Sequence, residues 1–342
     1  MMNIIKKLVL YPYHHFWLNS HYYRWNVLAK QCNKAQYKEL CRLYAERVDL
    51  KDVEPLKCVC CIYEGVVFQG GLADRLRGIL STYMVCKEYN IQFKLYFKHP
   101  FDLEMFFLPN QYDWHIEQNQ ITHDLSKLSF VIIDTTENSI YQSNRQMKTM
   151  RTLLHGFRLQ THVYTNANFC YQCDYSSLFH ELFKLSPRLE NKLHELKQHA
   201  GDHYLSISCR FLDLLGDFNE SFGYGKPLSN EEKKELIAAN INQIQLLHES
   251  HPNKKILVNS DSVTFLAAVQ QLNYVFVNPG EVTHVDNTNS ASYETFEKTF
   301  IDFLMIANAE HIYLQRTGRM MNSGYPYAAS LIYNKPFTTI NF

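Results

Sequence analysis

The sequence predicts an α/β protein made of two consecutive nucleotide-binding-type domains, and three observations lead to this prediction. Short apolar runs that read as strands alternate with stretches of helical apolar spacing, a pattern typical of parallel sheets wrapped by helices. The length of 342 residues suits two domains of roughly 100–200 residues each. Polar or glycine-containing loops follow several predicted strands, at the edge where such sheets bind ligands.

Three parts follow from this pattern. An N-terminal helical arm occupies residues 1–56, a first α/β domain residues 57–180, and a second α/β domain residues 181–342. The arm reads as helical pieces, and ten Lys/Arg against five Asp/Glu in the first 60 residues make it basic. Its aromatic residues concentrate in Tyr11–Trp25. This mixture fits peripheral contact with an anionic membrane surface, or a partly solvated segment that packs on the domain.

Composition excludes some functions. The 34 Lys/Arg residues balance 34 Asp/Glu, so no overall field favours a polyanion, and we expect no nucleic-acid partner. No stretch approaches the ~18 apolar residues that a membrane span needs, and Met1–Leu10 lacks the pattern of a signal peptide. We therefore expect a cytoplasmic protein, membrane-peripheral if the arm binds a bilayer.

The nine cysteines include two close groups, and such groups invite a zinc interpretation. One group is Cys58, Cys60 and Cys61, and the other is Cys170 and Cys173, which alone has CxxC spacing and has no matching pair. The odd count and the lack of an export signal favour reduced thiols over disulfides or zinc. We therefore predict no metal site.

In the first domain, an apolar run ending at Val66–Phe68 predicts a strand, and Gly70 and Gly71 predict a turn after it. Apolar residues from Leu72 to Tyr83 then recur at helical spacing. Phe93–Phe97 and Phe130–Ile133 read as further strands, whereas 164–186 gives no clear pattern.

The second domain has a clearer pattern. Ser229 and Glu232 form a capping box that predicts the start of a long helix. Two further helices are predicted around 265–272 and 296–307, and a last one from about Ser323. The predicted strands are Tyr204–Ser208, Lys255–Asn259, Tyr274–Val277 and His311–Leu314.

Four loop motifs follow the predicted strands. The first, Phe68–Ile79, holds the two glycines, whose backbone can approach a phosphate, although an ordinary strand-to-helix turn uses the same residues. In the second, Arg210 follows a buried strand and either reaches a ligand or pairs with Asp213 or Asp217. In the third, Asp261 and Ser262 either cap a helix or contact a ligand.

The fourth motif begins in the last long helix at Asp302 and ends at the turn Ser323–Gly324–Tyr325. The turn alone would be a helix N-cap with an aromatic residue packed on it. The first motif does not match the dinucleotide pattern G-x-G-x-x-G, so a nicotinamide cofactor is not favoured.

Taken in order, the four motifs resemble those of the GDP-fucose-dependent fucosyltransferases, which form α-1,2 and α-1,6 linkages or modify proteins. Ser208–Asp213 is similar to the family motif His-x-Arg-Arg-x-Asp, whose first Arg contacts the β-phosphate. Here Ser208 replaces the His and Phe211 the second Arg. The resemblance spans residues 66–333 and implies that the donor-binding residues are Gly70, Gly71, Arg75, Ser208, Arg210, Asp261, Ser262, Asp302, Ser323, Gly324 and Tyr325.

The resemblance also implies a GT-B fold, in which two Rossmann-like domains face each other. It implies an inverting, metal-independent transfer of fucose from GDP-fucose to a hydroxyl of a glycan acceptor. The lack of a secretory anchor suggests a surface glycan or glycolipid as that acceptor. Arg210 would support the leaving nucleotide, and Asp74 and Asp213 are the catalytic carboxylates we name, with Asp217 a further candidate for the base. No Asp-x-Asp pair follows a predicted strand, which agrees with a reaction that needs no metal.

Three alternatives stay open at this point. The chain is a GDP-sugar-binding protein without transfer activity, which the substitutions at Ser208 and Phe211 would explain. It is a transferase that uses another GDP-sugar, because the motifs chiefly hold GDP. Or it is an interaction module that is stabilised by a metal ion bound at its cysteine groups.

Overall fold

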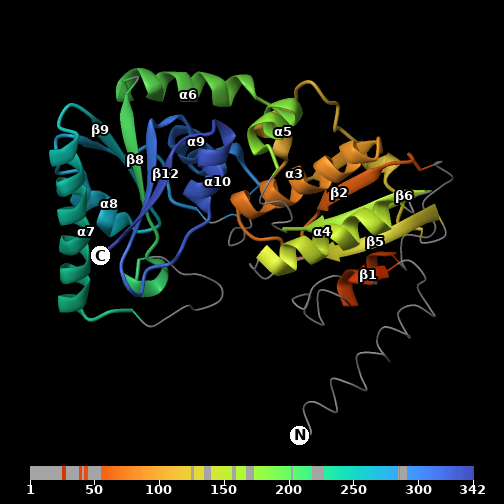
Figure 1. Cartoon of the computed structure of the whole chain (residues 1–342), viewed down its shortest axis with the longest axis horizontal. Helices are drawn as coiled ribbons and strands as arrows, with labels where there is room; N and C mark the ends of the chain where they lie inside the picture. Colours follow the sequence, from red (N-terminus) through yellow and green to blue (C-terminus); the bar gives the residue numbers. More distant parts are fainter. Residues whose placement is uncertain are drawn as a thin grey trace, which may run out of the picture. The chain divides into compact units, whose positions relative to one another are not determined.

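The computed structural model describes residues 25–27, 38–40, 42–44, 55–124, 127–134, 140–155, 159–166, 173–201, 203–217, 227–283, 285 and 291–342. Two compact units divide the chain (Figure 1). The first comprises 1–70, 74–99 and 112–173, and the second 71–73, 100–111 and 174–342. The chain passes finally into the second unit at Asp174.

The first unit contains a five-stranded, all-parallel sheet in the order β1-β5-β6-β2-β3. Two helices accompany these strands, α3 (Leu72–Glu88) and α4 (Ile140–His155). The strands are β1 (Trp25–Val27), β2 (Val59–Tyr63), β3 (Phe93–Phe97), β5 (Leu128–Asp134) and β6 (Gln160–Thr165).

Two predictions for this unit are wrong. The arm was expected to consist of helical pieces without a clear strand, but Trp25–Val27 forms a strand that pairs with β5. The strand before the glycine turn was expected to end at Val66–Phe68, but it is Val59–Tyr63, and all five of its residues are buried. A loop containing Gly65, with φ 87°, follows it. The rest of the arm lies largely outside the described residues.

The second unit has its own five-stranded parallel sheet in the order β10-β9-β8-β11-β12. Its predicted alternation of strands and helices is confirmed, including the capping box at Ser229. The strands are β8 (Tyr204–Cys209), β9 (Lys255–Ser260), β10 (Val275–Phe276), β11 (His311–Arg316) and β12 (Phe337–Asn341). The helices are α5 (Tyr175–Leu182), α6 (Pro187–Ala200), α7 (Asn230–Ser250), α8 (Val263–Val269), α9 (Tyr293–Asn308) and α10 (Tyr325–Ile332).

Aromatic packing explains why residues 100–111 belong to the second unit. Phe106 stacks on Phe300 of α9 with ring centroids 3.9 Å apart, and Phe101 lies 4.5 Å from Phe296. In the same segment β4 (Phe107–Pro109) pairs antiparallel with β7 (Phe183–Leu185). Burial of these large rings contributes more than the short strand pair does.

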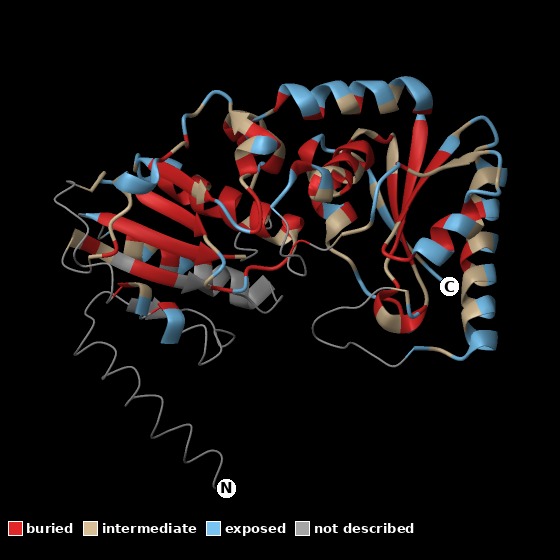
Figure 2. Ribbon diagram, turned by 180° about the vertical axis from the view of Figure 1, so that it is seen from behind, coloured by how far each residue is buried: buried red, intermediate tan, exposed pale blue. Residues whose placement is uncertain are grey.

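The two faces of the second sheet differ. Leu205, Ile207 and Cys209 of β8 form a core with Ile244 of α7 and Phe265 of α8. Side chains of the opposite parity point to the other face, where the Tyr204 hydroxyl donates to the Met305 carbonyl of α9 at 2.6 Å. Figure 2 shows both the buried strands and the exposed outer side of α7.

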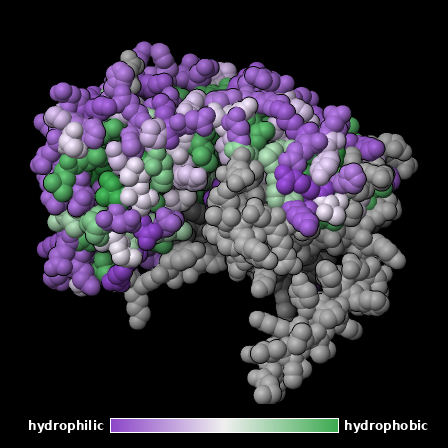
Figure 3. Space-filling model, viewed as in Figure 1, coloured by the Kyte–Doolittle hydropathy of each residue, from purple (hydrophilic) through white to green (hydrophobic). Residues whose placement is uncertain are grey.

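The described residues form no helix that is long and apolar enough to cross a membrane. On the face shown in Figure 3, hydrophilic residues predominate and apolar ones are scattered between them. The exposed large apolar residues of the second unit come from separate elements, such as Leu246 in α7, Val263 in α8 and Tyr327 in α10. Such scattered residues are ordinary on a protein surface.

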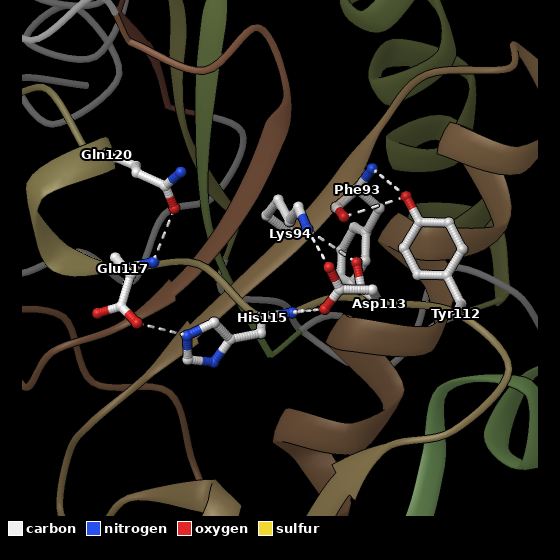
Figure 4. Close-up of polar contacts among 7 residues, drawn as sticks. All are labelled: Phe93, Lys94, Tyr112, Asp113, His115, Glu117 and Gln120. Atoms are coloured by element: carbon white, nitrogen blue, oxygen red, sulfur yellow. Dashed lines mark hydrogen bonds and ion pairs between the residues drawn. The ribbon is translucent and has the colours of Figure 1, made fainter.

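The edge strand β3 of the first unit is covered by the segment that follows it (Figure 4). The Tyr112 hydroxyl accepts from the Phe93 N–H at 2.7 Å and lies 3.1 Å from its carbonyl. The Leu95 N–H donates to the Trp114 carbonyl, and Lys94 forms an ion pair with Asp113 at 3.1 Å. These contacts satisfy backbone groups that an exposed edge would offer to another chain.

A buried polar network includes two residues of β6, His162 and Tyr164. The Tyr44 hydroxyl lies 2.5 Å from Nδ1 of His162, whose Nε2 lies 2.8 Å from the Gln160 side-chain oxygen. Tyr164 lies 3.1 Å from the Tyr44 hydroxyl and donates to Glu64 at 2.7 Å. Burial, together with nearby His123, holds the pKa of His162 well below its ordinary value.

This network predicts acid sensitivity of the first unit. Below about pH 6.5, the ordinary pKa of histidine, the unfolded chain takes up a proton that folded His162 does not accept, so stability falls with pH. We expect His162→Gln to remove about 1 kcal/mol of the stability loss between pH 6.5 and 5.5. Hydrogen exchange of β6 amides measures this, with partly exposed His115→Gln as control. An identical loss in wild type and His162→Gln would contradict it.

Candidate functional site

The carboxyl ends of β8 and β9 bring two predicted site residues together. The parallel register pairs Ser208 with Asn259 and Cys209 with Ser260. The next residue on each strand is Arg210 and Asp261, and they form an ion pair with Nε 3.3 Å from Oδ2. The pairing of these two residues is therefore a direct consequence of strand register.

Asp261 positions the loop that carries the arginine. Its carboxylate is fully buried and accepts hydrogen bonds from the N–H groups of Phe211 at 2.9 Å and Leu212 at 2.7 Å. Burial raises the pKa of Asp261, and Arg210 acts against that rise. Leu212 has φ 54°, an uncommon conformation for a residue with a side chain. The Arg210 side chain remains 21% exposed, so its guanidinium can reach a ligand.

Ser262 caps α8, as one of the sequence interpretations stated. Its Oγ accepts from the Phe265 N–H at 3.1 Å and donates to Asp217 at 2.8 Å. Asp217 also accepts from the Thr264 N–H at 2.8 Å. Burial acts to raise the pKa of Asp217, but these hydrogen bonds hold it below its ordinary value. Asp217 is thus a second capping residue of α8.

Beside Arg210 lies a buried polar pair that has no protein partner. Ser208 and Asn259 are 7% and 6% exposed, on the sheet face opposite the α7 and α8 core. Among the described residues, neither the Ser208 hydroxyl nor either end of the Asn259 amide forms a hydrogen bond. Leaving such groups unpaired costs about 1–3 kcal/mol each. They therefore indicate a bound polar partner.

Asn259 was not among the site residues predicted from the sequence. The sequence contains an indication of its position, because side chains alternate along Lys255–Ser260. This alternation puts the Asn259 amide on a buried face at the ligand-binding end of the strand. A polar residue near the end of a largely apolar strand was not by itself distinguishable from a structural one.

Asp302 of α9 lies in a second buried polar group. Its carboxylate accepts from the Asn278 side chain at 2.9 Å and pairs with Lys298 at 3.1 Å, while Lys298 also donates to the Asn278 carbonyl. Burial raises the pKa of Asp302, and Lys298 opposes this. Asn278 follows β10, the strand that pairs with β9.

The turn Ser323–Gly324–Tyr325 begins α10 and is close to the arginine loop in the fold. The Met321 N–H donates to the Arg210 carbonyl at 3.1 Å. Ser323 Oγ accepts from the Tyr325 N–H at 3.3 Å, and the Tyr325 hydroxyl donates to the Thr299 carbonyl. Ser323 therefore precedes the N-cap residue of α10, which is Gly324 and makes no side-chain capping bond. The aromatic ring of Tyr325 packs 5.3 Å from Phe303.

The glycine motif of the first unit is a tightly built turn. Gly70 has φ 69°, and a Cβ there would lie 2.8 Å from a carboxylate oxygen of Asp74. Arg75 is buried and donates to the carbonyls of Gly70 at 2.8 Å and His99 at 2.7 Å. Asp74 forms an ion pair with Arg77. These contacts support the turn, and Gly71 follows it directly before α3.

The remaining predicted residue, Asp213, lies in the 3-10 turn Leu212–Leu214, directly after the arginine. Phe211, which stands in the place of the second family arginine, is buried with its ring 4.9 Å from Phe265. The Phe211 side chain, which differs from the family motif, is therefore part of the hydrophobic core.

Within the described residues, the buried free cysteines are Cys58, Cys60, Cys61, Cys86 and Cys209. Burial raises the pKa of Cys58 and of Cys61 to about 12, so both are unreactive thiols at neutral pH. Across the part of the chain that the structure covers, no three His, Cys, Asp or Glu side chains are grouped as a metal site. Cys170 lies outside the described residues.

Comparison with known proteins identifies solved structures that have a similar fold. No protein-family model matches the sequence, and no curated protein matches it. A mutant of FUT1 from Arabidopsis thaliana in complex with GDP has a TM-score of 0.52 at 11% identity, covering 91% of this chain and 76% of that one.

A second similar structure is NodZ α-1,6-fucosyltransferase from Bradyrhizobium, co-crystallised with GDP. Its TM-score is 0.50 at 14% identity, and the match covers 81% of this chain and 92% of that one. The predicted fold class is confirmed: the chain has the GT-B fold of fucosyltransferases.

Proposed function

We propose that this protein is a glycosyltransferase that moves fucose from GDP-fucose to a hydroxyl of a glycan or glycolipid acceptor, with inversion and without a metal. One observation carries the proposal: Asp261 holds Arg210 at the carboxyl end of β8, beside the unpartnered polar groups of Ser208 and Asn259. The fold is shared with two proteins solved with GDP.

Arg210 would stabilise the departing nucleotide. In the transfer, the bond between the anomeric carbon and the β-phosphate oxygen breaks, and the electron pair leaves with GDP. A guanidinium with five donors can bind two phosphate oxygens at once. Since Asp261 and the backbone fix the position of Arg210, little reorganisation is needed as charge develops.

Ser208 and Asn259 would supply the polar contacts beside the diphosphate. An amide offers one acceptor and two donors, and a hydroxyl offers both kinds of group, so the pair suits the polar edge of a nucleotide or sugar. Asp302, Ser323 and Gly324 stay predicted donor contacts at neighbouring loops. Asp261, Ser262 and Tyr325 would act chiefly by holding the loops, as would Arg75 in the first unit.

The acceptor side is proposed for the first unit, and we place the protein in the cytoplasm, with peripheral membrane contact through the basic arm. The chief alternative is a GDP-sugar-binding protein without transfer. Persistent GDP binding with no turnover of GDP-fucose on any acceptor would favour it.

Calorimetric titration with GDP and ADP tests the donor site. We expect wild type to bind GDP more tightly than ADP, equally in EDTA and in magnesium. Arg210→Ala should lose about 2 kcal/mol or more, roughly 30-fold, the scale of a truncated buried charge contact. Arg188→Ala removes an exposed arginine of the same unit and is the matched control. Equal binding of both nucleotides, or none, would contradict the proposal.

Asn259→Leu separates a ligand-binding role from a structural one. Because the amide has no described protein partner, replacing it with an apolar group of similar size should leave stability unchanged or raise it by up to about 1–2 kcal/mol. The same change should weaken GDP-fucose binding at least tenfold. Urea unfolding and calorimetry measure the two effects. Lost stability with unchanged affinity would show that the amide is structural.

A further inference from the structure

Arg316 ends β11, the strand next to the one that leads to Arg210. β11 pairs in parallel with β8, and Gln315 is in register with Cys209. The residue after Gln315 is Arg316, and the residue after Cys209 is Arg210. The two arginines therefore follow one another across neighbouring strands of the second unit, at the carboxyl edge where such sheets bind ligands.

The alternation of β11 puts Arg316 on the same sheet face as Ser208. The Gln315 side chain donates to the Asn240 side-chain oxygen of α7 at 2.8 Å, so it lies on the α7 face. Residues on either side of it in the strand lie on the opposite face. One of them, Leu314, is in register with Ser208, whose buried hydroxyl has no described partner. Arg316 is the other, so it follows on the face that carries the unpaired polar groups.

The charge of Arg316 is not neutralised by the protein. Arg316 is partly exposed, and within the part of the chain that the structure describes its guanidinium forms no hydrogen bond or ion pair. Arg210, by contrast, is paired with the buried Asp261 at 3.3 Å. Arg316 therefore adds a positive charge to an edge where the charge of Arg210 is already offset.

The segment that begins at Arg316 is held against the arginine loop. The Met320 N–H donates to the Thr317 carbonyl at 2.7 Å, and the Met321 N–H donates to the Arg210 carbonyl at 3.1 Å. The Met320 side chain is buried in the core between the sheet and α7. Strand pairing on one side and this turn on the other thus fix the backbone that carries Arg316.

Two guanidinium groups at neighbouring positions repel each other, whereas an anion beside both is attracted by both. Both phosphates of a sugar nucleotide are negatively charged, and planar guanidinium groups match phosphate oxygens in geometry. The ion pair with Asp261 leaves Arg210 by itself little net charge for such a ligand. A second arginine at this edge therefore suits a diphosphate better than a neutral ligand.

We propose that Arg316 is a second diphosphate-binding residue of the donor site and contacts the phosphates together with Arg210. This rests on the proposed function and deepens it. As the bond from the anomeric carbon to the β-phosphate oxygen breaks, the electron pair leaves with GDP and negative charge grows on that phosphate. A fixed guanidinium beside it stabilises this charge.

Calorimetric titration of the full chain with GDP tests the proposal. We expect Arg316→Gln, which removes the charge and keeps a polar side chain, to weaken GDP binding about tenfold or more, the scale of a lost charge-assisted hydrogen bond. Arg316→Lys keeps the charge without the planar set of donors, so its affinity should lie between those of Arg316→Gln and wild type. Added salt should weaken GDP binding less in Arg316→Gln than in wild type.

Arg319→Gln is the matched control. Arg319 belongs to the same turn, is exposed and lies 3.7 Å from Glu232 on α7. Its loss removes the same charge three residues further along the chain, and GDP binding should stay as in wild type.

The outcomes separate the role of Arg316 from the proposed function. A loss of about threefold or less in Arg316→Gln, with tight binding of GDP by wild type, would overturn the role of Arg316 and leave the proposed function intact. Arg316→Lys as weak as Arg316→Gln, with unchanged salt dependence, would also overturn it, since this indicates a merely structural role. An equal loss in Arg319→Gln would overturn it as well, because the effect would then not be specific to this position. Wild type that does not bind GDP would overturn both.

Discussion

The ion pair between Arg210 and Asp261 is the interaction on which the candidate donor site depends. Burying a carboxylate is costly, and pairing alone often fails to offset the desolvation. Here Asp261 also accepts two backbone N–H groups, from Phe211 and Leu212. The result is a guanidinium fixed at the ligand-binding edge of the sheet while part of it stays exposed. Strand register produces this arrangement, because β8 and β9 run parallel and end together.

The residues buried on the two faces of the second sheet differ in chemistry and in whether they have protein partners. On the face towards α7 and α8, Ile207, Val258 and Phe265 form an apolar core. On the opposite face, Ser208 and Asn259 are buried without protein partners. A fold selected for stability alone would place apolar groups at these positions, since unpaired buried polar groups are destabilising. Their presence is explained if a polar ligand completes the hydrogen bonds.

The sequence was sufficient to predict the second unit, because each of its main elements has a strong local signal. The Ser229 capping box and the apolar run Lys255–Asn259 are confirmed within a residue or two. The first unit was less predictable. Trp25–Val27 is too short to show alternation, and the strand Val59–Tyr63 has no alternation because both of its faces are buried.

For the site, the sequence identified the loops but not how their side chains are used. Arg75 and Tyr325 were expected to contact the donor, yet their polar groups bond to backbone carbonyls. Such bonds depend on tertiary contacts that no local motif encodes. Asn259 was not predicted as a site residue for the converse reason. It is a single residue, and its pairing with Ser208 depends on the neighbouring strand.

Hydrogen–deuterium exchange of the whole chain, with and without GDP-fucose, tests the central claim most directly, namely that the donor binds at the carboxyl ends of β8 and β9. Our account predicts that GDP-fucose slows exchange in residues 208–217 and 259–264, and that Arg210→Ala largely abolishes this protection at the same ligand concentration. Unchanged exchange in both segments at saturating GDP-fucose, with protection confined to other parts of the chain, would contradict it.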